Sequence, residues 1–129
     1  MHRETIGMIN MASFKVQLPE QHLIANNIHI DMGKLREGNY LTRCFAMLVP
    51  YVEDEPCGLC MDMIDHFNAE VEGHEKLIAP ATSYVKIMQN GQAEKISVIL
   101  TIGDVSVIVN NFERLRYFYC RGVSMICLI

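Results

Sequence analysis

Two cysteines three positions apart, Cys57 and Cys60, are the residues of this sequence best suited to chemistry. Pro56 precedes them, and the residues that follow predict that the pair opens a helix. The positive end of a helix lowers the pKa of a nearby thiol and favours the reactive thiolate. A pair with this spacing also binds zinc in many proteins. The pair therefore has two candidate uses, thiol redox chemistry and a structural metal site.

The segment Pro56-Cys57-Gly58-Leu59-Cys60 falls between a predicted strand and a predicted helix. It resembles the active-site turn of thioredoxin-like oxidoreductases. The resemblance implies thiol–disulfide exchange through Cys57 and Cys60. Three carboxylates at positions 53–55 directly precede the pair and oppose thiolate formation.

A zinc site needs further ligands beside the two sulfur atoms. His66 lies six residues after Cys60, about 9 Å along a helix and on a different face, so it cannot share the ion. His74 follows the predicted helix and could fold back toward its start. The zinc hypothesis therefore uses Cys57, Cys60 and His74.

Other motifs for catalysis are absent from the sequence. It has no calcium-loop spacing, no glycine-rich phosphate loop, no GxSxG and no HExxH. Ser97, Ser106, His29 and Asp31 form no triad that the sequence supports. We therefore assign no catalytic residue, expect no cofactor and predict that the protein is not an enzyme.

Basic and aromatic residues interleave near the end of the chain, at Arg114, Arg116, Tyr117, Tyr119 and Arg121. Such residues anchor protein interfaces and also form platforms for single-stranded RNA. The net charge of −4 disfavours nucleic acid because phosphates would meet a repulsive field. An aromatic core with arginines extending along it is the structural alternative. The segment favours a protein partner.

Three apolar runs between Ser83 and Val109 predict an antiparallel meander. The register that avoids facing lysines pairs Ile87 with Ile96 and Leu100 with Val107. One face of the meander is then aliphatic. The other face should be polar, yet it carries a row formed by Tyr84, Ile99 and Ile108. This row predicts a surface that a partner covers.

The remaining segments give a helix and further strands. Cys60, Ile64, Phe67 and Val71 recur at helical spacing and predict the principal helix, over residues 57–72. Strands are predicted over 13–18, 27–32, 40–52 and 123–129, and 112–120 is interpreted as a strand rather than a helix. The predicted fold class is α+β, a mainly antiparallel sheet with one principal helix; a β-rich sandwich or barrel is the alternative.

Composition and length bound the class of protein. The 129 residues are half apolar and a fifth charged, which predicts a single domain over 1–129 with residues 1–12 loosely held. No apolar stretch approaches the roughly 18 residues of a membrane span, and five cysteines suit reduced thiols, so a cytoplasmic location is expected.

The charge is unevenly placed: residues 53–75 carry eight acidic and no basic groups, whereas residues 76–129 carry six basic and three acidic groups. This asymmetry permits docking between chains. The sequence therefore predicts a non-enzymatic interaction module that self-associates or caps another protein. A small redox or zinc-stabilised protein acting through Cys57 and Cys60 is the alternative.

Overall fold

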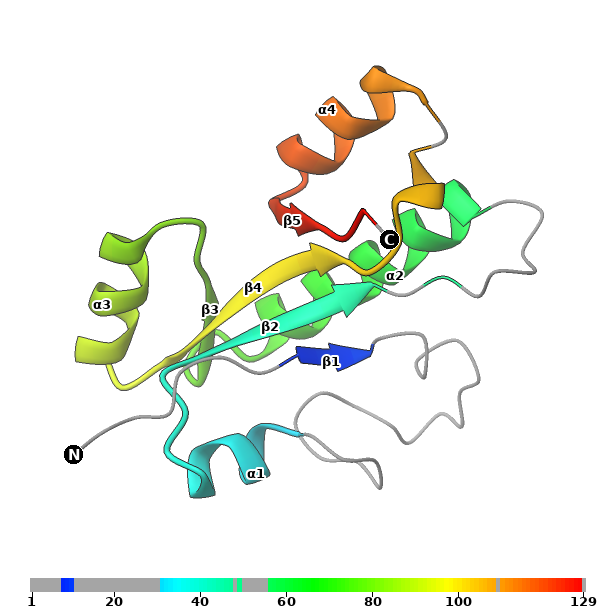
Figure 1. The fold of residues 1–129 in the computed structure, drawn as a ribbon. Coiled ribbons are helices and arrows are strands. Elements are labelled where there is room, and N and C mark those ends of the chain that lie inside the picture. The colour runs from blue at the N-terminus through cyan, green and yellow to red at the C-terminus, as the bar shows by residue number, and fades with distance from the viewer. Residues whose placement is uncertain (1–7, 11–30, 48, 50–55, 109, 129) are drawn as a thin grey trace.

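The fold is built on a five-stranded parallel sheet (Figure 1). The structure is a computed structural model, and it describes residues 8–10, 31–47, 49, 56–108 and 110–128. The strands are β1 (Met8–Asn10), β2 (Thr42–Met47), β3 (Ile78–Pro80), β4 (Ile96–Ile102) and β5 (Val123–Ile126). β4 pairs with β2 along one edge. On its other edge β4 pairs with β3 at its start and with β5 at its end.

Helices connect the parallel strands, as parallel pairing requires. They are α1 (Met32–Glu37), α2 (Pro56–Gly73), α3 (Tyr84–Gln92), the short 3₁₀ helix η2 (Val105–Val107) and α4 (Phe112–Cys120). From β2 through β4 each strand is followed by a helix, which is the pattern of an α/β fold. No helix in the described part of the chain is both long and apolar enough to span a bilayer.

Polar side chains fix where three of these helices begin. The side chain of Asp31 accepts a hydrogen bond from Lys34 N at 2.9 Å, and Ser83 does the same for Lys86 N at 3.2 Å. At α4, Asn111 accepts from Glu113 N at 3.0 Å. Each bond satisfies an amide that the first helical turn leaves unpaired.

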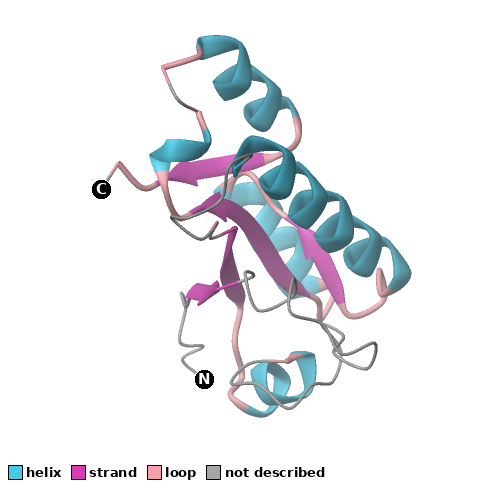
Figure 2. Ribbon diagram, turned by 90° about the vertical axis from the view of Figure 1, so that its right-hand side faces the viewer, coloured by secondary structure: helices cyan, strands magenta, loops and turns pink. Residues whose placement is uncertain are grey.

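The hydrophobic core lies between the sheet and α2, which passes behind β2 and β4 in Figure 1 and lies on one side of the sheet in Figure 2. Alternate residues of β2 and β4 enter it, Phe45 and Met47 from β2 and Val98, Leu100 and Ile102 from β4. The predicted helix is confirmed, because Cys60, Ile64, Phe67 and Val71 of α2 are all buried.

The prediction of an α+β fold with an antiparallel meander is wrong, and so is the sandwich or barrel alternative. Every strand pair in the described residues is parallel. Residues 84–92 form α3 instead of a strand, so Ile87 does not pair with Ile96. Val107 lies in η2 and does not pair with Leu100, whose partners are Phe45 and Val123. Residues 112–120 form the helix α4 and not the predicted strand.

Local hydrogen bonds explain these errors. The predicted meander needs turns near Asn90 and Asp104, and both residues have other roles: Asn90 is buried and donates to Ser97 Oγ at 3.0 Å, and Asp104 accepts from Ser106 N at 2.7 Å. β5 does occupy part of the predicted strand 123–129 but pairs in parallel with β4. The predicted strand 13–18 and residues 27–30 of the strand 27–32 lie outside the described residues, as does the segment 1–12 apart from β1.

One residue after α3 adopts a backbone conformation that its side chain disfavours. Glu94 has a φ of 61° directly after the helix end, a position where glycine is preferred. We expect Glu94→Gly to raise the free energy of unfolding by about 0.5–1 kcal/mol. Gln89→Gly, at an exposed position within α3, should lower it by about the same amount. Urea denaturation of both variants tests this; equal signs for the two changes would contradict it.

Candidate functional site

The carboxyl ends of the strands meet at one edge of the sheet. Met47 of β2 pairs with Ile102 of β4, which pairs with Ile126 of β5. The ladder continues past the strand ends, since Gly103 N donates to Met47 O and Cys127 N donates to Ile102 O, both at 2.9 Å. Parallel α/β folds bind their ligands outside this edge, so it is the candidate site.

The loop after β4 is held firmly at this edge. Asp104 caps η2 through Ser106 N, and Val107 is fully buried in the core. Arg114 Nη1 donates to Val107 O at 3.5 Å, which ties the loop to α4. Asp104 is half-buried and is the carboxylate that follows β4. The sequence did not predict that Asp104 caps a helix, because the pair Gly103-Asp104 is also typical of a hairpin turn. The signal for the cap was the position of Asp104 two residues before Ser106.

The sheet face opposite α2 is lined by small and polar side chains. Thr42, Ser97 and Thr101 are buried there together with Cys44 and Ala46. The two threonine hydroxyls donate to backbone carbonyls of the neighbouring strand, Thr42 to Ser97 O at 3.1 Å and Thr101 to Phe45 O at 3.3 Å. This face is polar but its threonine hydroxyls are satisfied, so they add no free catalytic group.

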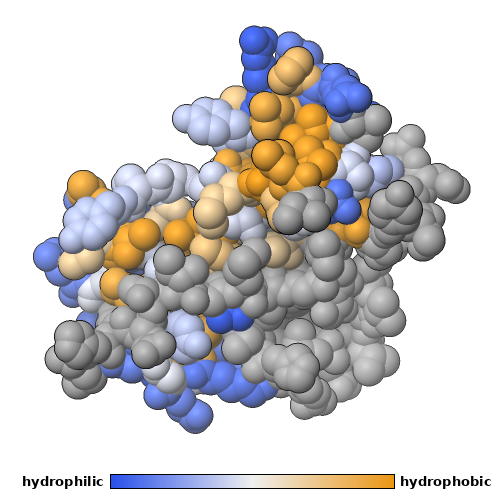
Figure 3. Space-filling model, in the orientation of Figure 1, coloured by the Kyte–Doolittle hydropathy of each residue, from blue (hydrophilic) through white to orange (hydrophobic). Residues whose placement is uncertain are grey.

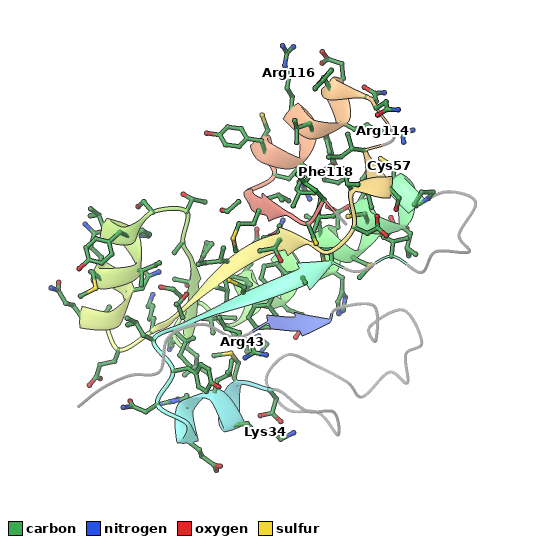
Figure 4. The ribbon with its side chains drawn as sticks, in the orientation of Figure 1. Lys34, Arg43, Cys57, Arg114, Arg116 and Phe118 are labelled. Atoms are coloured by element: carbon green, nitrogen blue, oxygen red, sulfur yellow. The ribbon has the colours of Figure 1, made fainter. Side chains whose placement is uncertain are left out.

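A buried cation lies at the other end of β2. Arg43 is only 7% exposed and its guanidinium lies 5.9 Å from the centre of the Tyr40 ring (Figure 4). Burial lowers the pKa of Arg43, while the nearby Tyr40 and Cys44 raise it by a smaller amount. Because this group lies near the amino end of the strand, it is separate from the candidate edge.

The predicted thiol sites are structural. Cys57 and Cys60 are buried and free, and burial, with a smaller contribution from Cys57, raises the pKa of Cys60 to about 12. Desolvation thus outweighs the helix terminus at Cys60, and the thiol stays protonated. His74 lies at the opposite end of α2, where Nδ1 is 2.8 Å from Glu70 O. Cys57, Cys60 and His74 therefore do not meet.

Metal ligands do not gather among the described residues. No group of three or more His, Cys, Asp or Glu side chains in that part of the chain could hold an ion. Asp104 and the exposed Cys127 are the metal-binding residue types that directly follow β4 and β5 at the candidate edge. These two residues do not by themselves make a metal centre.

The predicted partner-binding residues separate into two groups. Arg116 and Tyr119 line a groove of about 470 Å³ between α4 and β5, and Tyr84 and Ile99 line a smaller groove beside it. The other four lie apart from the grooves: Ile108 follows η2, Arg114 bonds Val107 O, Tyr117 packs edge-on against Phe118 and Arg121 forms an ion pair with Asp65. The basic and aromatic residues 114–120 thus lie on a helix and not on a strand.

Residues 7–129 match the family model described as membrane dipeptidase, peptidase family M19. No curated protein sequence gives a significant match.

Several solved structures share the fold. A metallopeptidase from Rhodobacter sphaeroides, liganded with a phosphinate mimic of the dipeptide L-Ala-D-Ala, is 12% identical with a TM-score of 0.84 over 96% of this chain and 44% of its own. The metallopeptidase named dipeptidase AC, of family M19, is 14% identical with a TM-score of 0.81 over 96% and 41%. The probable dipeptidase PvdM from Pseudomonas aeruginosa is 11% identical with a TM-score of 0.77 over 98% and 34%.

These matches overturn the functional prediction. A family of peptidases contradicts both the non-enzymatic, self-associating module and the redox or zinc-stabilised alternative. It also contradicts the expectation that the protein is not an enzyme. The chain spans less than half the length of each of these solved structures.

Proposed function

The chain belongs to the membrane dipeptidase family, peptidase family M19, and from this premise we propose that it supplies part of the active site of a hydrolase that cleaves dipeptides. The observation that carries the proposal is the family match over residues 7–129, combined with a parallel sheet whose carboxyl ends meet at one edge. The substrate class follows from the family and from the dipeptide mimic bound by the R. sphaeroides enzyme.

Asp104 is the residue that we assign to substrate binding at this edge. A dipeptide carries a free ammonium group, and a carboxylate accepts charge-assisted hydrogen bonds from such a group. One oxygen of Asp104 caps η2 at 2.7 Å from Ser106 N, which fixes the carboxylate in place. Val49 and Val107 beside the strand ends are buried, at 3% and 0% exposure. The loop can thus orient one end of the substrate.

A metal ion supplies further chemistry in metallopeptidases, where it polarises the peptide carbonyl and activates a water molecule. The described residues do not provide three ligands for such an ion. We therefore assign to these residues only the binding and orientation of the substrate.

The phosphinate mimic of L-Ala-D-Ala tests this proposal by NMR titration of the labelled chain. Its tetrahedral phosphorus resembles the transition state of peptide hydrolysis, so we expect it to bind at least about tenfold more tightly than the dipeptide itself. The largest chemical shift changes should fall on the amides of Gly103, Asp104 and Cys127. Changes centred elsewhere, or equal affinity for both ligands, would argue against a hydrolytic site at this edge.

A matched pair of variants tests the role of Asp104. Asp104→Asn keeps the acceptor for Ser106 N and removes the charge, so it should weaken binding of the mimic about tenfold, equivalent to about 1.4 kcal/mol. Asp62→Asn makes the same charge change on an exposed position of α2 and should leave the affinity unchanged. Calorimetry measures both; equal losses would show a general charge effect instead of a contact.

A further inference from the structure

A small pocket lies at the opposite end of the sheet from the candidate edge. It encloses about 240 Å³ and is lined by Arg36, Asn39, Tyr40, Glu94 and Ile96. These residues come from α1, from the loop that enters β2, and from the connection between α3 and β4 together with the start of β4. β2 is six residues long, so the pocket lies about 15 Å or more from the carboxyl ends of the strands. It is therefore separate from the candidate edge.

The lining of this pocket carries one charge of each sign. Arg36 and Glu94 are exposed, and neither forms an ion pair with another residue that the structure describes. Asn39 and Tyr40 add an amide and a phenol, and Ile96 adds an apolar side chain that is 5% exposed. The surface over α1 is hydrophilic in Figure 3, whereas hydrophobic side chains gather over α4 and β5. The pocket thus suits a small ligand with both a positive and a negative group.

Two contacts hold the Tyr40 ring in place. Gly38 lies so close to the ring that a Cβ at this position would come within 2.9 Å of it. The guanidinium of Arg43 lies 5.9 Å from the ring centre. Next to Tyr40 along the chain, Leu41 O accepts a hydrogen bond from Ser97 N at 3.0 Å, which joins this loop to β4. This wall of the pocket is therefore formed before a ligand arrives, which reduces the entropy lost on binding.

Two lining residues adopt the left-handed backbone conformation. The angle φ is 56° at Asn39 and 61° at Glu94. Asparagine adopts this conformation readily, whereas glutamate is strained in it and glycine would not be. Residues that depart from local preference in this way are concentrated at functional sites. The strain at Glu94 therefore indicates that its carboxylate has a use in the pocket.

We propose that this pocket binds a free α-amino acid with a small side chain. The carboxylate of the ligand binds Arg36, its ammonium group binds Glu94, and its side chain lies near Ile96. The volume of about 240 Å³ is below the roughly 300–1,000 Å³ of pockets for drug-sized ligands, which suits a molecule of this size. Amino acids are also the products of dipeptide hydrolysis. That link to the reaction rests on the proposed function, whereas the binding itself rests on the pocket alone.

NMR titration of the labelled 129-residue chain with L-alanine tests the inference. The largest chemical shift changes should fall on the amides of Asn39, Tyr40 and Glu94. N-acetyl-L-alanine lacks the ammonium group and L-alaninamide lacks the carboxylate. Each should bind at least about tenfold more weakly than L-alanine, because each loses one charge-assisted contact.

Matched variants connect each contact to one group of the ligand. Glu94→Gln should remove the preference for L-alanine over N-acetyl-L-alanine, and Arg36→Gln should remove the preference over L-alaninamide. Glu94→Gly should weaken binding while raising the midpoint of urea unfolding, which separates a lost contact from a lost fold. Glu72→Gln changes the same charge at an exposed position of α2 outside the pocket and should leave the affinity unchanged.

Each outcome decides the inference. Saturable shift changes at the pocket, with each preference lost only in its matching variant, support it. The absence of such changes, equal affinity for the three ligands, or an equal loss in Glu72→Gln overturns it. L-alanine that shifts only the amides of Gly103 and Asp104 also overturns it and leaves the proposed function standing. Binding at the pocket by a chain that does not bind the phosphinate mimic retains this inference and rejects the proposed function.

Discussion

Replacing Phe45 with alanine is expected to lower the free energy of unfolding by about 4 kcal/mol, as the loss of a fully buried aromatic ring does in other domains. The Phe45 side chain is fully buried in β2, between β1 and β4, and its ring centre lies 5.3 Å from that of Phe67 in α2. Its removal opens a cavity between the sheet and the helix, and that loss is a large part of the roughly 5–15 kcal/mol of an ordinary domain.

A matched control keeps this result interpretable. Phe112→Ala removes the same ring from a position on α4 that is 76% exposed, so the free energy of unfolding should change by less than about 0.5 kcal/mol. Urea denaturation followed by circular dichroism measures both variants. If Phe45→Ala does not fold, Phe45→Leu should still lose about 1 kcal/mol. Similar losses at both positions would contradict a core centred on β2.

The thiol of Cys60 should be alkylated by iodoacetamide at least about a thousand times more slowly than that of Cys127 in the folded protein. Burial raises the pKa of Cys60 from 9.0 to about 12, so its thiolate is about a thousandfold rarer at neutral pH. The side chain is also fully inaccessible, whereas Cys127 is exposed. Mass spectrometry of peptides after timed labelling measures the two rates. Comparable rates would contradict a buried, protonated Cys60.

The raised pKa of Cys60 also makes the free energy of unfolding depend on pH. The pKa of Cys60 is higher in the folded protein than in the unfolded chain, so folding retains the proton. The protonated Cys60 thiol therefore contributes to the free energy of unfolding. This contribution is fully present below about pH 9 and is lost as the pH rises toward 12. Cys60→Ala should therefore flatten the decline of the free energy of unfolding in this range.

The sequence predicts elements well where one signal dominates. The principal helix is predicted over 57–72, within one residue of α2 at each end, because its apolar residues recur with a helical period over about three turns. β2 falls inside the predicted strand 40–52 because its residues are buried on both faces. α3 is different. Its sequence fits a short strand as well as a helix, at Tyr84, Val85 and Ile87. The hydrogen bond from Lys86 N to the Ser83 side chain favours the helix.

Strand direction could not be predicted from such local signals. Hairpin turns offer nearby partners for every apolar run, whereas the true neighbours are distant: Thr42 pairs with Ser97, 55 residues away. The candidate edge escapes prediction for the same reason, because it consists of ends of strands that are brought together only by the parallel order. The family match likewise spans residues 7–129, a far longer stretch than the short motifs sought in the sequence.

The position of β4 has a consequence for how this chain folds. β2, β3 and β5 all pair with β4, which is the fourth of the five described strands in the sequence. During synthesis β2 and β3 therefore leave the ribosome before the strand that joins them exists. Pairing over such separations is slow, because the entropy of closing a long loop must be overcome first. Until Ile102 has emerged, the unpaired backbone edges and the apolar side chains of β2 and β3 remain open to aggregation, and chaperone binding is expected during this interval.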